Sequence, residues 1–172
     1  MTRTGKAIRR IVLIAAMTAI LEVSKFALNA IANVELITLL IILFTEKFGW
    51  KSTLASVILF AVLESMWWGV SIWTITYFYV WPLLVWISVW LAKEESVLLK
   101  SVVAGVFGLL FGLLCTLPTL LMAGFNAAVS WWIAGIPFDL VHGISNFLLC
   151  LLLYRPLARA LDAVRREPKR ST

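Results

Sequence analysis

The sequence is poor in charged residues and in the residues that build disulfides and metal sites. Only 14% of its 172 residues are charged, and it has two cysteines and one histidine. So small a share of charged residues excludes a soluble globular domain, whose surface is covered by charged and polar side chains. Cys115 and Cys150 lie inside apolar segments, which excludes a disulfide-built secreted domain. A single histidine leaves no convincing set of metal ligands, and we expect no metal and no other cofactor.

Several catalytic motifs are missing as well. The chain has no glycine-rich phosphate loop ending in Lys-Ser/Thr, so we do not expect it to hydrolyse ATP. It has no elbow serine and no obvious nucleophile for a triad. It also shows no convincing internal repeat of the kind that builds many secondary transporters. The missing catalytic motifs argue against an enzyme, and the missing repeat argues against a self-contained secondary transporter.

Hydrophobic residues, by contrast, make up 62% of the chain. Apolar runs of about 20 residues match a hydrocarbon layer of roughly 30 Å, and only helices cross it as separate segments. We therefore predict an all-α integral membrane protein with six transmembrane helices and kinks at Pro82 and Pro118. The predicted spans are 7–28, 34–48, 52–68, 73–92, 102–123 and a sixth that starts near residue 137. Residues 124–135 are expected to form an interfacial loop or lid.

The basic residues indicate the orientation of these spans. Of the 15 basic residues only Lys25 falls in the outer half of the predicted topology. The positive-inside rule then places both termini in the cytoplasm of a multi-pass cell-membrane protein. The net charge of +6 is accordingly a topology signal, and no nucleic-acid partner is expected. We divide the chain into a single membrane domain, residues 1–157, and a basic cytoplasmic tail, residues 158–172.

Ionisable and polar residues open the sixth span. Asp139, His142 and Asn146 are three and four residues apart, so a helix places them along one face. Pro137 is expected to start that helix, with Asp139 in its first turn near the positive end of the helix dipole. Such residues in a membrane helix mark one wall of a ligand pocket. The alternative is that Asp139 caps its helix and that the other two form interhelical hydrogen bonds.

Other unusual residues collect at the predicted external side. An apolar, aromatic pocket with a few convergent polar groups is typical of small-molecule sites. The candidate substrate-binding residues are Asn33, Glu35, Glu64, Trp67, Trp68, Tyr77, Asn126, Trp132, Asp139, His142 and Asn146. Tryptophan and tyrosine also gather at any membrane interface, Asn33 can cap the second helix, and Glu22 with Lys25 can form an intrahelical pair.

Two spans carry small residues at intervals of four. They are Ala15 and Ala19 in the first span and Ala104, Gly108 and Gly112 in the fifth. This spacing lets two helix backbones approach closely. The pattern does not say whether each stripe packs within the chain or docks a partner.

The whole chain resembles the substrate-binding S component of an energy-coupling-factor vitamin transporter. The similarity lies in its length, its six predicted spans and three segments, which are residues 15–19, 33–40 and 137–146. The resemblance implies that Ala15 and Ala19 dock a transmembrane coupling subunit. It further implies a small-molecule micronutrient as substrate and two cytoplasmic ATPase subunits that drive its delivery.

The substrate and two rival functions stay open. Four external carboxylates against the single Lys25 disfavour a phosphorylated anion, and the tryptophans favour a flat ring or a cation. A neutral or cationic heterocycle and a larger corrinoid both satisfy these conditions. The rival functions are a self-contained secondary transporter and a small membrane enzyme in which Asp139 and His142 act as acid and base.

Overall fold

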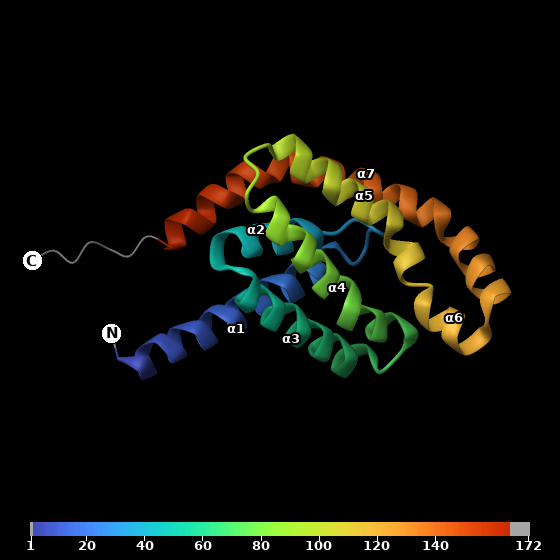
Figure 1. The fold of residues 1–172 in the computed structure, drawn as a ribbon, viewed down its shortest axis with the longest axis horizontal. Helices are drawn as coiled ribbons and strands as arrows, with labels where there is room; N and C mark the ends of the chain where they lie inside the picture. The colour runs from blue at the N-terminus through green and yellow to red at the C-terminus, as the bar shows by residue number, and fades with distance from the viewer. Residues whose placement is uncertain (1, 166–172) are drawn as a thin grey trace, which may run out of the picture.

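The computed structural model describes residues 2–165, which fold into helices without any strand (Figure 1). The all-α prediction is therefore confirmed. The helices are α1 (Arg3–Leu28), α2 (Ile37–Phe48), α3 (Trp50–Trp68), α4 (Ile72–Leu91), α5 (Val97–Leu114), α6 (Leu117–Ala123) and α7 (Phe125–Arg165). Within the described residues, four helical segments are long and apolar enough to cross a membrane: Arg3–Leu28, Ile72–Leu91, Val97–Ala123 and Phe125–Val164.

Helix α2 is the central helix of the fold. All nine residues from Ile37 to Thr45 are buried. Its 12 residues extend only about 18 Å, at about 1.5 Å per residue, which is less than the thickness of the hydrocarbon layer. A helix that is hydrophobic on every side belongs inside a protein. Residues 34–48 were predicted to be a span, but the helical part is a short core helix.

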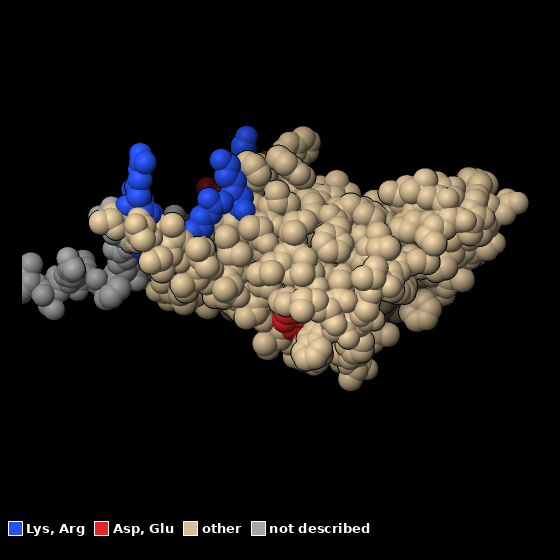
Figure 2. Space-filling model, turned by 90° about the horizontal axis from the view of Figure 1, so that it is seen from below, with Lys and Arg blue, Asp and Glu red and all other residues tan. Residues whose placement is uncertain are grey.

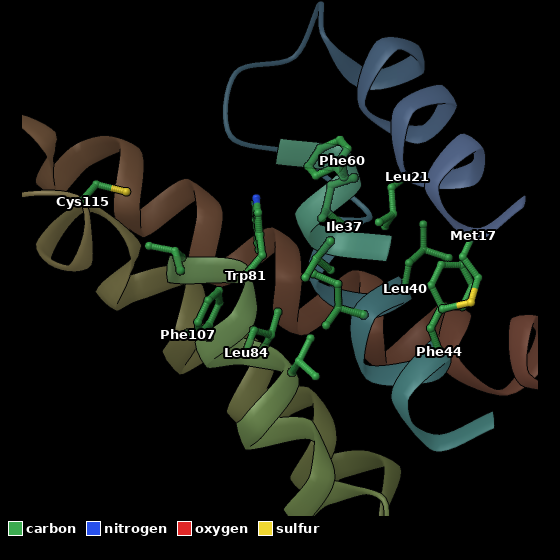
Figure 3. Packing of buried hydrophobic residues seen from close by; sticks show 14 residues of the cluster. Met17, Leu21, Ile37, Leu40, Phe44, Phe60, Trp81, Leu84, Phe107 and Cys115 are labelled. Carbon is green, nitrogen blue, oxygen red and sulfur yellow. The ribbon is translucent and has the colours of Figure 1, made fainter. Parts of the chain in front are cut away.

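Large apolar side chains from three helices meet around α2. Figure 3 shows Phe44 of α2, Phe60 of α3 and Leu84 of α4 in this cluster, and each is fully buried. Met17 and Leu21 of α1 pack from the other side (Figure 3). Burying one such side chain contributes about 1.5–3 kcal/mol in water and less against lipid, so in a membrane the close packing itself is the larger contribution.

The last helix begins much earlier than its sequence indicates. The residues predicted to form an interfacial loop or lid, 124–135, are helical from Phe125 onward, and Pro137 lies inside α7. The turn is made at Gly124, whose φ of 83° suits glycine. A proline removes one backbone hydrogen bond, which membrane helices tolerate when neighbouring segments satisfy the freed group. Asp139 consequently lies well inside α7 and does not cap it.

The predicted fifth span is divided into α5 and α6. The helix breaks at Cys115 and Thr116, and Pro118 stands in the first turn of α6. Tyr79 of α4 donates a hydrogen bond to the Leu114 carbonyl at 2.9 Å, which satisfies an acceptor that the break leaves free. Beyond the break, α6 lies at the right of the molecule (Figure 1) and contacts α4.

Helices α5 and α7 run side by side and pack through small residues (Figure 1). A Cβ atom on Gly108 would lie 2.8 Å from the His142 carbonyl oxygen and 2.9 Å from the Gly143 backbone. A Cβ on Gly105 would lie 3.0 Å from Phe147 Cβ. The stripe of small residues in the fifth span thus packs within the chain.

The basic side chains of the face in Figure 2 gather at one end of the molecule. On the face in Figure 2 the Lys and Arg side chains lie near the end where α1 starts. The rest of this face shows no Lys or Arg side chain. At the basic end Lys100 of α5 donates to Tyr154 of α7 at 2.6 Å and pairs with Glu46 of α2. Lys47 pairs with Asp162 at 3.0 Å.

Part of the predicted cytoplasmic tail belongs to the helical fold. Residues 158–165 continue α7, and Leu161 packs against the hydrophobic core. The predicted tail was 158–172, and its residues 166–172 lie outside the described part of the chain. The ion pair of Asp162 with Lys47 gives this extension a fixed partner on α2.

The close contact of α5 with α7 predicts the effect of adding one methyl group. We expect Gly108→Ala to lower the free energy of unfolding by about 1–3 kcal/mol, because the added Cβ meets backbone atoms that cannot rotate away. Gly135→Ala is the matched control, since a Cβ there meets nothing within 4 Å. Thermal unfolding in detergent measures both, and equal midpoints would show that α5 and α7 do not pack as described.

Candidate functional site

A cavity of about 610 Å³ lies between the loop after α1 and the surrounding helices. Residues of the loop 29–36 and of the end of α1 form one side, and α2, α3, α4, α5 and α7 contribute the others. Five of the predicted site residues line it, and they come from three separate parts of the chain. These five are Asn33, Glu35, Tyr77, Asp139 and His142.

Aromatic rings in contact form much of the cavity wall. Tyr77 stacks on Phe60 at 5.9 Å between ring centroids, and its other neighbour, Trp81, lies at 5.5 Å. Trp81 contacts Phe111 of α5 at 5.4 Å, and Phe111 meets the His142 ring edge-on at 4.8 Å. We call Phe60, Tyr77, Trp81 and Phe111 the aromatic wall. Its rings offer flat apolar surfaces to a ligand.

A second aromatic contact joins α4 to the start of α7. Trp73 and Trp131 both line the cavity, and their ring centroids are 5.4 Å apart. Trp131 reaches this position only because residues 125–135 are helical. The segment predicted to be a lid thus contributes a rigid part of the cavity wall.

Polar contacts hold the loop 29–36 against α7. Ser145 Oγ donates to the Asn33 carbonyl oxygen at 3.0 Å, and His142 Nε2 lies 3.1 Å from Glu35 Oε1. Asn33 has a φ of 58°, a left-handed conformation that asparagine adopts more readily than most residues. It therefore turns the loop and does not cap α2. Glu35 instead accepts the Thr38 backbone N–H at 2.9 Å, in the role of a cap.

The loop position of Glu35 affects its ionisation. Burial acts to raise the pKa of Glu35, but the contacts with His142 and Thr38 outweigh burial, and the pKa lies below its ordinary value of 4.5. Glu35 therefore carries a negative charge into the cavity wall at neutral pH. His142 thus has its hydrogen-bond contact with Glu35, and no hydrogen bond between His142 and Asp139 is found among residues 2–165.

Asp139 is placed by the packing of α7 on α5. Its Oδ1 accepts the backbone N–H of Gly112 at 2.9 Å. Any Cβ at position 112 would collide with the Asp139 carboxylate, so glycine is needed there. A backbone N–H inside a helix is normally bonded four residues back, and its contact with a carboxylate shows how closely the two helices approach.

An ion pair lies at the other side of the cavity. Lys25 of α1 lines the cavity and forms an ion pair with Glu64 of α3, which is buried. The Lys25 ammonium also lies 5.0 Å from the centre of the Tyr77 ring, within the range of a cation–π contact. The alternative partner of Lys25 within α1 was Glu22. The charges of Glu22 and Lys25 do interact, but among the described residues no hydrogen-bond partner is found for either Glu22 carboxylate oxygen.

Six predicted site residues lie outside the cavity lining. Trp67 and Trp68 are 69% and 58% exposed and contact Phe26 on the outer surface. Asn146 is buried and donates to Thr38 Oγ1 at 3.1 Å, so it forms an interhelical hydrogen bond. Glu64 forms an ion pair with Lys25, and Lys25, not Glu64, lines the cavity. Asn126 is exposed and Trp132 is partly buried, and neither lines the cavity.

Several lining residues were not among the predicted site residues. They are Lys25, Phe60, Trp73, Trp81, Phe111, Gly112, Trp131 and Phe138. Trp73, Trp81 and Trp131 belong to the aromatic clusters that the sequence places at the external side, and this position was the available signal. Phe60 and Phe111 carry no such signal, because phenylalanine is common in every apolar helix.

The first of the two small-residue stripes differs from the second. Ala15 and Ala19 are exposed, whereas Met17 and Thr18 face the core. The stripe on α1 therefore lies at the surface of the molecule.

No group of three or more His, Cys, Asp or Glu side chains suited to a metal ion occurs in residues 2–165. Comparison of the chain with protein-family models, curated proteins and solved structures gave no match.

The ionisation of Glu35 predicts how stability depends on pH. A folded pKa below 4.5 means that Glu35 stabilises the fold above this value and that the contribution is lost as the pH falls through the lower folded pKa. We expect Glu35→Gln to lower the free energy of unfolding by about 1–3 kcal/mol at neutral pH. The difference from wild type should shrink in acid. Chemical unfolding at a series of pH values measures this.

The control for that series is Glu94→Gln, which changes an exposed turn residue. A Glu35→Gln curve that stays parallel to wild type at every pH would mean that the contact with His142 does not favour the charged form.

Proposed function

We propose that this chain is the substrate-binding subunit of an energy-coupling-factor transporter and captures a small-molecule micronutrient at the external side of the cell membrane. The observation that carries the proposal is the cavity of about 610 Å³, with its aromatic wall and few polar groups, in a chain of apolar helices. Small-molecule sites are typically about 300–1,000 Å³ and have this lining. The volume favours a single heterocycle over a corrinoid.

The distribution of charge supports the proposed orientation. Lys47, Lys51 and Lys100 lie with the start of α1 at the basic end, whereas Glu35 and Asp139 line the cavity. Under the positive-inside rule the basic end faces the cytoplasm and the cavity opens outward. In this orientation both termini are cytoplasmic, as expected for six crossings.

The exposed stripe on α1 supports a partner within the membrane. Ala15 and Ala19 are exposed, and two small residues at this spacing allow another helix to approach closely. The transmembrane coupling subunit would pack here, and two cytoplasmic ATPase subunits would supply the energy for delivery. The chain carries no phosphate loop of its own.

The first test of the proposal is to identify any small molecule that co-purifies with the protein. Purified alone in detergent, the protein should carry a small molecule in one-to-one ratio, which mass spectrometry of the denatured protein identifies. Uptake of that molecule into cells should require the coupling and ATPase subunits. Uptake without ATPase subunits would instead favour a self-contained secondary transporter, and chemical conversion of the molecule would favour a membrane enzyme.

Substitutions on α1 separate docking from binding. We expect Ala15→Leu and Ala19→Leu to lower uptake at least about ten-fold, because a bulky side chain overpacks a close helix contact by about 1–3 kcal/mol. Ligand affinity and thermal stability should stay at wild-type values, since both residues are exposed. Ala123→Leu, at an exposed position of α6, is the control. Lost ligand binding in the α1 variants would contradict a docking role.

A further inference from the structure

A second hollow in the surface lies on α3 beside the start of α1, at the basic end of the molecule. This hollow, which we call the α3 groove, has a volume of about 530 Å³ and shares no lining residue with the cavity described above. Arg10 of α1 and Lys51 of α3 line it, and both are exposed. Arg10 comes two turns before the buried Met17, so it lies on the side of α1 that packs on the rest of the chain.

The remaining length of the α3 groove is apolar. Leu54, Ile58 and Val62 line it at intervals of four residues, which places them along one face of α3. From Lys51 to Val62 the helix extends about 16 Å at about 1.5 Å per residue, close to the roughly 15 Å of hydrocarbon in one leaflet of a bilayer. The groove thus has a basic end and an apolar length that matches one leaflet.

A pair of tryptophans marks the level of the lipid headgroups. Trp50 lines the groove beside Lys51, and its ring centroid lies 5.1 Å from that of Trp86 on α4. The Lys51 ammonium is 5.4 Å from the centre of the Trp50 ring. Tryptophan prefers the boundary between hydrocarbon and headgroups. The Lys51 ammonium is therefore at the depth where the phosphate of a neighbouring lipid lies.

The positive charge of the α3 groove is not neutralised by carboxylates. Within residues 2–165 neither Arg10 nor Lys51 takes part in an ion pair, whereas Lys25, Lys47 and Lys100 each have a carboxylate partner. No described Asp or Glu lines the groove, and the first turn of α3 holds no acidic residue. An anion can therefore reach both cations without displacing a carboxylate. A guanidinium binds a phosphate through two parallel hydrogen bonds, and an ammonium binds it as a point charge.

We propose that the α3 groove binds one anionic phospholipid of the cytoplasmic leaflet. The phosphate contacts Arg10 and Lys51, and one acyl chain lies along Leu54, Ile58 and Val62. A zwitterionic phospholipid fits less well, because its cationic headgroup adds a further positive charge at the same end. The inference rests on the proposed function only in the orientation of the chain, with the basic end at the cytoplasmic face of the membrane. It needs neither a substrate nor a coupling subunit.

Lipid retention by the full-length chain tests this preference. Protein in detergent is mixed with equal amounts of dioleoyl phosphatidylglycerol and dioleoyl phosphatidylcholine, which have the same acyl chains, and native mass spectrometry counts the bound lipids. We expect one phosphatidylglycerol per chain, retained at least about ten-fold more than phosphatidylcholine, because each basic residue at the headgroup contributes about five-fold. Equal retention of the two lipids would overturn the inference without any need for a variant.

Two matched double variants assign the preference to the groove. Arg10→Gln with Lys51→Gln should bring the ratio of bound phosphatidylglycerol to phosphatidylcholine to near one. Arg3→Gln with Lys93→Gln removes the same charge from exposed positions outside the groove and should leave the ratio unchanged. An equal loss of preference in both double variants would mean that the whole basic end attracts anionic lipids diffusely, and would contradict a site.

The apolar length has a test of its own, which separates a lipid from a soluble phosphate. Ala55 also lines the groove, and Ala55→Phe should fill it and lower the retention of both lipids several-fold. Ala123→Phe, at an exposed position of α6, is the control. Glycerophosphoglycerol, the headgroup without acyl chains, should not displace bound phosphatidylglycerol at equal concentration. Displacement by this headgroup would show that the site holds a phosphate alone, and the lipid assignment would be wrong.

The results also separate this inference from the proposed function. If the two lipids are retained alike while uptake of a co-purified small molecule needs the ATPase subunits, the binding-subunit proposal stands and the lipid site is wrong. If phosphatidylglycerol is retained with the expected ratio but uptake is independent of the ATPase subunits, the lipid site stands and the transporter role is wrong. Loss of uptake in Arg10→Gln with Lys51→Gln at an unchanged lipid ratio would assign the groove to the coupling subunit and overturn the inference.

Discussion

The close packing of α5 against α7 is the constraint on which the cavity depends. A Cβ on Gly108 would lie 2.9 Å from the Gly143 backbone, and the Leu109 side chain packs directly on Gly143, so neither glycine leaves room for a larger residue. This contact sets the register of the helices and places Gly112 opposite Asp139. One carboxylate oxygen is thereby fixed to α5 and the other is left free. In lipid, where apolar burial contributes little to association between helices, such backbone contact is a main source of helix affinity.

The polar residues of α7 perform two different tasks on one helix face. His142 and Asn146 join the helix to Glu35 and Thr38, and these contacts hold the loop 29–36 in place. Asp139, one turn earlier, keeps one oxygen without a partner. The two interpretations of this stripe, as hydrogen-bond contacts and as a pocket wall, therefore both describe parts of it. The paired residues hold the loop 29–36 on α7, and Asp139 and His142 line the cavity beside it.

The sequence predicts the type of fold and one helix face, and the limits of that prediction have physical causes. Spacing alone places Asp139, His142 and Asn146 together, because helical periodicity is local. The start of α7 was predicted at Pro137, but the helix begins at Phe125. Proline is favoured in the first turn of a helix, and it is also tolerated inside a membrane helix whose neighbours satisfy the freed backbone group, so its position does not fix the start. The partner of Lys25 was also missed. Glu64 lies 39 positions away, and no local pattern distinguishes it from the nearer Glu22.

The charge balance of the cavity follows from which of its ions are paired within the protein. Among the described residues that line the cavity, Lys25 is the one Lys or Arg. Its positive charge is paired with the buried carboxylate of Glu64, which does not line the cavity. Glu35 is stabilised as a carboxylate by contacts from α7 and α2. The interior surface consequently keeps negative character although the chain as a whole carries +6. The net charge of the chain thus reflects the basic end of the molecule. The preference of the cavity for a neutral or cationic ligand is set by a few buried carboxylates, which act strongly because little water screens them.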